Sequence, residues 1–128
     1  MATVEDVDRI ALALPEVEPT TSYGAPAWSV RRRVFAWVRR FSAADLRRLE
    51  GSRVPPDPIL ALRVDGLDDK AALLQEAPAG LFTIEHLEGH PIVLVELAAV
   101  EPERLAELVE EAWSARAPAP LVRHWWER

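Results

Sequence analysis

The chain has 128 residues, no cysteine, and a formal net charge of −6 from 15 basic and 21 acidic side chains. This length fits one domain with its own core, so we expect a single domain over residues 1–128. The lack of cysteine excludes disulfides, thiolate metal sites and cysteine nucleophiles. The first residues are acidic, and the longest apolar run, Pro91 to Val95, is too short for a membrane helix. We therefore expect a cytoplasmic protein with no membrane partner.

The charge is distributed unevenly along the chain. From Arg31 to Arg63 there are nine arginines and three acids, a local balance of +6, whereas Asp65 to Arg128 carries −8. Such a division predicts one face that attracts anions on an otherwise acidic body. A composition rich in arginine and alanine can equally follow from GC-rich coding without any function. Both interpretations stay open at this point.

The first elements are a helix and a hairpin. Thr3 with Asp6 forms a capping pattern, and apolar residues at helical spacing predict a helix over about residues 4–14. Residues 17–22 are interpreted as a connector. Aromatic and β-branched residues predict strands over 23–30 and 34–40, joined by three arginines. In that register Trp28 opposes Ala36 and Ala27 opposes Trp37, so the two tryptophans face opposite sides of the sheet, although a slip of one residue would exchange the faces.

The later elements alternate strands and helices. In chain order we expect a short capped helix over 42–49, a proline-rich loop over 51–58, a strand over 59–64, a helix capped by Asp68 or Asp69, strands over 81–84 and 92–97, an amphipathic helix opening at Pro102, and a terminal helix over 121–127. This order predicts an α+β fold in which helices pack on one face of an antiparallel sheet.

No residues form recognisable catalytic machinery. His86 and His90 have the spacing of paired zinc ligands, but Gly89 and Pro91 argue against the helix that this spacing requires, which favours turn residues over a metal site. The serines lie in no nucleophile motif, and the five glycines are scattered rather than grouped into a phosphate-binding loop. We expect no enzymatic activity, no cofactor and no metal.

Two binding hypotheses follow from the remaining residues. In the first, arginines on and near the hairpin contact the phosphates of DNA, with Trp28 or Trp37 stacking on bases. The arginines are Arg31, Arg32, Arg33, Arg39, Arg40, Arg47 and Arg48. In the second, a groove between the sheet and the terminal helices binds a protein or a small molecule. Its predicted lining is Tyr23, Trp28, Trp37 and Trp125. We expect the protein to be a monomer.

An ordered set of short segments resembles the MmcQ/YjbR family of small bacterial proteins. The segments are Ala11 to Glu16, Thr21-Ser-Tyr-Gly-Ala-Pro-Ala-Trp28, Val34-Phe-Ala-Trp37, Phe82-Thr83 with His86, Gly89-His-Pro91, Val93 to Val95, and Leu105 to Ala117. The resemblance implies a frataxin-like fold and, because the family is described as DNA-binding through a double wing of hairpins, DNA as a partner. The first wing would fall on the three hairpin arginines and the second near residues 85–91. There, Glu85 and Glu88 replace the basic residues that relatives often carry.

Overall fold

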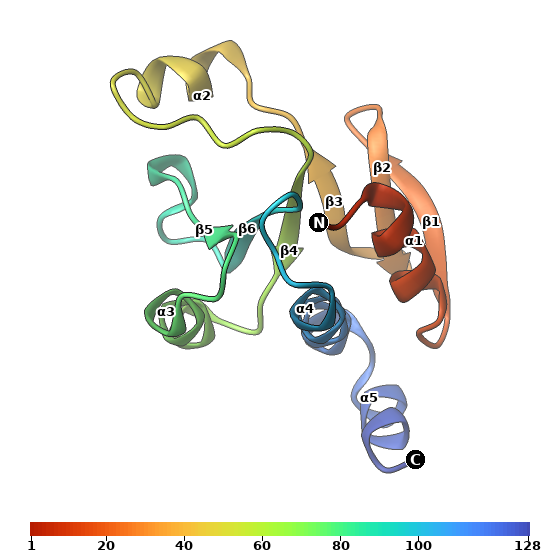
Figure 1. Cartoon of the computed structure of the whole chain (residues 1–128). Helices are drawn as coiled ribbons and strands as arrows, with labels where there is room; N and C mark the ends of the chain where they lie inside the picture. Colours follow the sequence, from red (N-terminus) through yellow and green to blue (C-terminus); the bar gives the residue numbers. More distant parts are fainter.

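The computed structural model describes all residues, 1–128, as one six-stranded antiparallel sheet with helices packed against it (Figure 1). The strands are ordered β1-β2-β3-β4-β6-β5 across the sheet. Their bounds are β1 (Val17–Ser22), β2 (Ala25–Val30), β3 (Arg33–Arg39), β4 (Ile59–Arg63), β5 (Leu81–Phe82) and β6 (Ile92–Glu96). The helices are α1 (Val4–Leu12), α2 (Ala43–Arg48), α3 (Leu67–Glu76), α4 (Pro102–Arg116) and α5 (Ala119–Trp126), with a 3-10 turn η1 (Glu85–Leu87). The predicted α+β class is confirmed.

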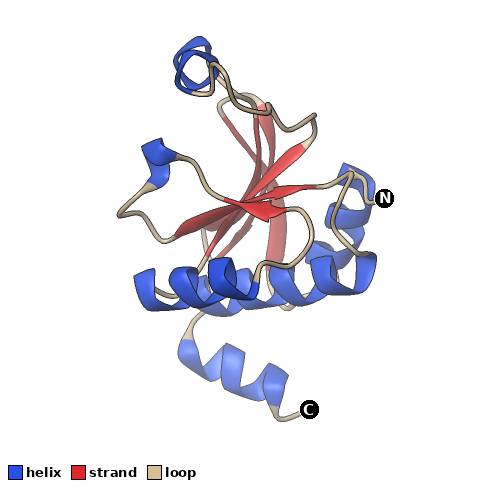
Figure 2. Ribbon diagram, turned by 60° about the vertical axis from the view of Figure 1, so that its left-hand side comes forward, coloured by secondary structure: helices blue, strands red, loops and turns tan.

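The main core lies between the sheet and the layer formed by α1, α3 and α4 (Figure 2). Trp28 from β2, Phe35 from β3 and Trp113 from α4 are its largest side chains, and none is more than 2% exposed. Each such aromatic residue contributes about 2–3 kcal/mol by leaving water. This layer is the helix-covered face that the sequence predicts. None of the helices is both long and apolar enough to cross a bilayer.

The opposite face of the sheet carries a second, smaller cluster. Ile59 and Ala61 from β4 and Leu94 from β6 are fully buried there, and Leu87 of η1 covers them. Trp37 packs at the margin of this cluster, whereas Trp28 belongs to the main core. The prediction that the two tryptophans face opposite sides is therefore confirmed.

The turn between β2 and β3 is shorter than predicted. It holds two residues, Arg31 and Arg32, with φ angles of 51° and 68°, and Val30 pairs with Arg33 instead of Val34. Positive φ at both central positions is the geometry of a type I′ turn, which glycine and asparagine adopt more easily than arginine. The shorter turn is balanced by a register shift at Trp28 and Ser29. The predicted pairs Trp28–Ala36 and Ala27–Trp37 are nevertheless present.

The interpretation of residues 17–22 as a connector is wrong. They form the edge strand β1, which pairs with β2 from Val17–Val30 to Ser22–Ala25. The segment contains Pro19 and mostly exposed polar residues, and so lacks the apolar alternation that identifies a half-buried strand. An edge strand tolerates such a sequence because one side of its backbone needs no partner.

Local signals were reliable at some helix ends and misleading at others. Thr3 and Ser42 each cap a helix through a reciprocal hydrogen-bond pair, as predicted for α1 and α2. For α3 the N-cap is Gly66, without a side-chain hydrogen bond, rather than Asp68 or Asp69. Helix α1 ends at Leu12, and β5 has only two residues.

Replacement of Trp113 by alanine tests the importance of the main core. Trp113 is 0% exposed, and its Nε1 donates to the Pro15 carbonyl at 3.1 Å, so Trp113→Ala leaves a large cavity. We expect the free energy of unfolding to fall by about 3–5 kcal/mol in urea denaturation. Trp126, which is 52% exposed, is the matched control, and Trp126→Ala should cost less than about 1 kcal/mol. Similar losses in both variants would contradict this account of the core.

Candidate nucleic-acid and ligand-binding surface

Strand β3 separates the predicted arginines into two groups. Arg31, Arg32 and Arg33 lie at the turn where β3 begins, and Arg39 lies at its last residue, followed by Arg40. Six residue steps of about 3.3 Å place the two ends about 20 Å apart. Arg47 and Arg48 belong to the second group, because they end the short helix α2 that follows β3. The seven arginines therefore do not form one continuous patch.

The turn group is partly neutralised by the protein itself. The Nε and Nη2 atoms of Arg31 donate to the two carboxylate oxygens of Glu16 at 2.6 and 3.0 Å. The Arg31 hydrogen bonds hold the pKa of the Glu16 carboxyl below its ordinary value. Arg33 donates to the carbonyl of Arg116 at 3.4 Å. Arg32 is exposed and forms neither an ion pair nor a side-chain hydrogen bond.

In the second group, Asp45 holds α2 beside the end of β3. Its carboxylate accepts hydrogen bonds from Arg39 at 3.0 and 3.5 Å and from the backbone N–H of Ser42 at 2.9 Å, and it is only 4% exposed. Arg48 approaches the same carboxylate at 3.7 Å. Burial alone would raise the pKa of Asp45, but the Ser42 N–H and Arg39 outweigh it, so the pKa lies below its ordinary value.

The remaining charge of the second group is available to a ligand. Arg40 and Arg47 are exposed and take part in no ion pair, and Arg48 is 47% exposed and held only loosely by Asp45. Arg39, by contrast, is 17% exposed and committed to Asp45. The second group thus combines one structural arginine with three cations that face solvent.

A cavity of about 390 Å³ lies among these arginines and brings aromatic side chains to them. Tyr23 from the β1–β2 turn and Trp37 from β3 line it together with Arg39, Arg40, Arg48 and His86. Tyr23 is fully exposed at a φ of 50°, so its ring has no packing partner within the chain. The cavity therefore offers two aromatic rings and several cations to one ligand. We call it the arginine–aromatic cavity.

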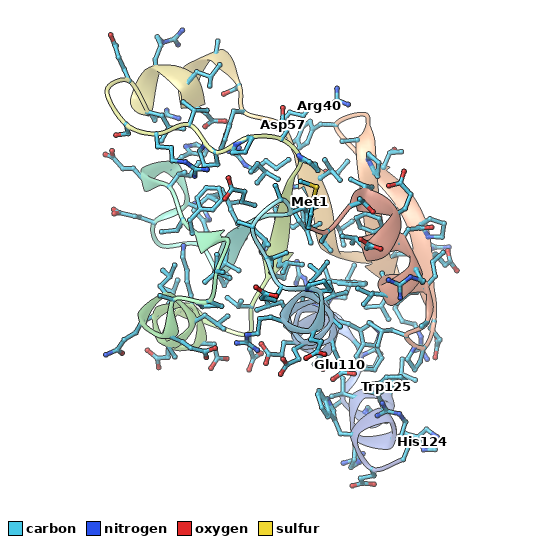
Figure 3. All side chains as sticks on the ribbon, viewed as in Figure 1. Met1, Arg40, Asp57, Glu110, His124 and Trp125 are labelled. Atoms are coloured by element: carbon cyan, nitrogen blue, oxygen red, sulfur yellow. The ribbon has the colours of Figure 1, made fainter.

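The tryptophan-lined groove predicted from the sequence does not form as one surface. Trp28 is 2% exposed, and its Nε1 donates to Asp8 under helix α1 at 2.9 Å, so it is a core residue that cannot stack on a ligand. Trp125 packs edge-on against Trp113 at 6.0 Å and donates to Glu110. Figure 3 shows Trp125 and Glu110 at the end of the molecule opposite to Arg40. Of the predicted lining, Tyr23 and Trp37 share a cavity.

A second cavity, of about 400 Å³, lies between α3, α4 and α5. Its lining includes Asp65, Asp69, Glu76, Glu111 and the exposed Trp126. Burial raises the pKa of the Glu111 carboxyl. Arg104 lowers this pKa, and the neighbouring carboxylates raise it again. This acidic lining repels anions, so the two cavities suit ligands of opposite charge.

The histidines do not gather into a metal site. His86 lies in η1 and His90 in the loop that follows, and the structure holds no group of three histidine, aspartate or glutamate residues suited to a metal ion. Instead, the buried Lys70 donates to the carbonyls of Leu87 and His90 at 2.7 and 2.9 Å. Desolvation lowers the pKa of Lys70, and Glu88 partly opposes this. These bonds fix the loop in which the family resemblance implies a second wing.

Comparison with known proteins identifies the family. The sequence profile described as YjbR matches residues 12–115. The chain belongs to the YjbR family. An uncharacterised protein of Mycobacterium tuberculosis, Rv2570, and one of Mycobacterium bovis, Mb2600, are each 40% identical to it over 126 residues, covering 96% of this chain and 95% of theirs. The crystal structure of Deinococcus radiodurans protein DR2400, a DUF419 domain, has a TM-score of 0.60 at 22% identity, covering 89% of this chain and 78% of that one.

Some residues of interest in this YjbR chain were missed by sequence reasoning. His86 was considered only as a metal ligand, yet it lines the arginine–aromatic cavity. Arg63 was counted only in the charge balance, yet its guanidinium carbon lies 5.8 Å from the centre of the Trp37 ring. The alternation of β4 carries a signal for this contact, because Arg63 shares a face with Ala61, the partner of Trp37.

The Asp45 interaction gives a prediction about stability. Asp45→Asn should lower the free energy of unfolding by about 2–3 kcal/mol near neutral pH, because Arg39 loses its buried partner. A carboxyl with a lowered folded pKa stabilises above its unfolded pKa, near 3.8, and loses that contribution as the pH falls through the folded pKa. The difference between wild type and variant should therefore shrink below about pH 4.

Urea unfolding at several pH values measures this effect. Glu50→Gln is the matched control, because Glu50 is exposed, lies just after α2 and takes part in no ion pair. If the difference in the free energy of unfolding between wild type and Asp45→Asn stays constant from pH 7 to below about pH 4, the lost interaction is not ionic.

Proposed function

We propose that this YjbR-family protein binds single-stranded DNA through the arginine–aromatic cavity and the exposed arginines beside it. The observation that carries the proposal is the convergence of Tyr23 and Trp37 with Arg40 and Arg48 around one cavity. Proteins that bind single strands combine cations that follow the phosphates with aromatic rings that stack on bases. Arg47, exposed on the same short helix, extends the cationic rim.

A single strand fits this surface better than a duplex. Stacking on Tyr23 or Trp37 requires a base face that is not already covered by a neighbouring base, and a duplex does not offer one. The double-wing arrangement that the family resemblance implies has less support in this chain. Arg31 is neutralised by Glu16, and the loop between β5 and β6 exposes Glu85 and Glu88. The proposed contact therefore uses the α2 end of β3 rather than the two hairpin tips.

The net charge of −6 limits binding at a distance but not at contact. At physiological salt the field of the distant carboxylates is screened beyond about 8–10 Å. A phosphate in contact with Arg40 or Arg48 is therefore governed by the local arginines. The binding should be weak at high salt, because each neutralised phosphate releases counterions.

The salt dependence of binding tests the proposal. With three phosphates bound by Arg40, Arg47 and Arg48, we expect the logarithm of affinity for a labelled oligonucleotide to fall against log salt with a slope near −2. Fluorescence anisotropy between about 50 and 200 mM salt measures it. Alanine at all three positions should bring the slope close to zero. Arg32→Ala, at the other end of β3, is the control and should leave the slope unchanged. The proposal fails if Arg32→Ala weakens binding and the triple variant does not.

The stacking contact has its own test. Tyr23→Ala should weaken binding of the same oligonucleotide by about fivefold or more, because a base stacked on an aromatic ring contributes about 1–3 kcal/mol. Tyr23 is fully exposed, so the substitution should leave the melting temperature unchanged. Equal affinities of wild type and Tyr23→Ala would remove base stacking from the proposal.

A small anionic ligand with a flat ring is the second candidate, and the size of the cavity favours it. A volume of about 390 Å³ lies within the usual range for small-molecule sites, about 300–1,000 Å³. Competition with a mononucleotide separates the two candidates. A mononucleotide that displaces the oligonucleotide at a similar concentration supports a small-molecule site. Affinity that rises steeply with strand length supports the polymer.

A further inference from the structure

Three arginines lie at the end of the sheet where β3 begins and β4 ends. Arg33 is the first residue of β3, Arg63 is the last residue of β4, and Arg116 ends helix α4. The Nη1 atom of Arg33 donates to the carbonyl oxygen of Arg116 at 3.4 Å. Burial lowers the pKa of the Arg116 guanidinium, and the charges of Arg63 and Arg33 lower it further.

This cluster lacks a counterion. None of its three arginines takes part in an ion pair, whereas Arg31, Arg39, Arg53 and Arg104 all have carboxylate partners. The Nε atoms of Arg63 and Arg116 are buried and have no hydrogen-bond partner, and they are two of the three side-chain atoms in the protein in that state. Buried donors of charged groups normally have partners, because leaving them unsatisfied costs free energy.

Structural roles explain only part of this arrangement. Arg33 satisfies a carbonyl at the C-terminal end of α4, where the helix dipole also favours the charge of Arg116. Arg63 lies over the Trp37 ring. These contacts leave both Nε donors unpaired and do not cancel three like charges. Asp65, the acid nearest to Arg63 in sequence, lines the acidic cavity and forms no ion pair.

We propose that Arg33, Arg63 and Arg116 together bind a tetrahedral oxyanion of the phosphate class. Guanidinium groups offer several N–H donors in a planar fork, which matches the spacing of phosphate oxygens. Such an anion neutralises the mutual repulsion of the three arginines and accepts hydrogen bonds from their terminal Nη groups. Arg63 lies over Trp37, which lines the arginine–aromatic cavity, but none of the three arginines is among the cations of the proposed DNA surface. Its anion comes either from free phosphate or from a phosphodiester of a bound strand.

Thermal unfolding with inorganic phosphate tests the site. Phosphate at about tenfold its dissociation constant should raise the Tm by about 4 °C above sodium chloride at equal ionic strength. Arg63→Met and Arg116→Met retain the apolar stem of the side chain and should abolish this rise. Arg32→Gln is the matched control, because Arg32 is exposed in the neighbouring turn, and it should retain the full rise. An equal rise in wild type, Arg63→Met and Arg116→Met overturns the proposal.

A measurement on the wild-type protein avoids any effect of substitution on folding. The guanidinium NMR signals of Arg63 and Arg116 should shift as phosphate is added. If an oligonucleotide shifts them and inorganic phosphate does not, the anion is a phosphodiester. If neither shifts them, the site does not exist. Alanine at Arg40, Arg47 and Arg48 leaves this test unaffected, so its outcome is separable from that of the DNA experiment.

Discussion

From Ala36 to Val38, after the register shift at Phe35, the side chains of β3 alternate between the two faces of the sheet, and the position of Trp37 depends on this alternation. Ala36 faces the main core and Trp37 faces the opposite side, where its ring lines the arginine–aromatic cavity. The strand also separates its flanking arginines, with Arg33 at its start and Arg39 at its end. A slip of one residue would place Trp37 in the core and expose its neighbours. The burial of Trp28 opposite Ala36 makes such a slip costly.

Features with a local cause could be predicted from the sequence, and features set by distant partners could not. The capping boxes at Thr3 and Ser42 depend on residues three positions apart, and both are present. Strand β1 depends on its pairing with β2, and its own mostly exposed, polar sequence does not predict a strand. The hairpin turn is an intermediate case. Its strands were evident, but arginine at two positive-φ positions carries none of the glycine or asparagine signal that identifies a type I′ turn.

The same distinction applies to the candidate sites. Arginines that are adjacent in sequence were expected to act together. Arg31, however, forms an ion pair with Glu16, a residue 15 positions earlier that directly precedes β1. Tyr23 and Trp37, two of the predicted aromatic candidates, line one cavity, but Trp28 and Trp125 were grouped with them only because sequence alone gives no side-chain burial. The cluster of Arg33, Arg63 and Arg116 is drawn from two strands and a helix. No linear pattern reveals such a convergence.

The difference between paired and unpaired arginines explains how an acidic protein can offer anion-binding sites. Arg39 and Arg31 are satisfied by carboxylates, so an incoming phosphate would have to compete with a partner that is already in place. Arg40 and Arg47 have no such partner, and Arg116 is held close to two other cations. A phosphate at these positions gains attraction without breaking an ion pair, and near Arg116 it also relieves repulsion. Because salt screens the more distant acids, the local balance of pairing determines where an anion binds, rather than the net charge of −6.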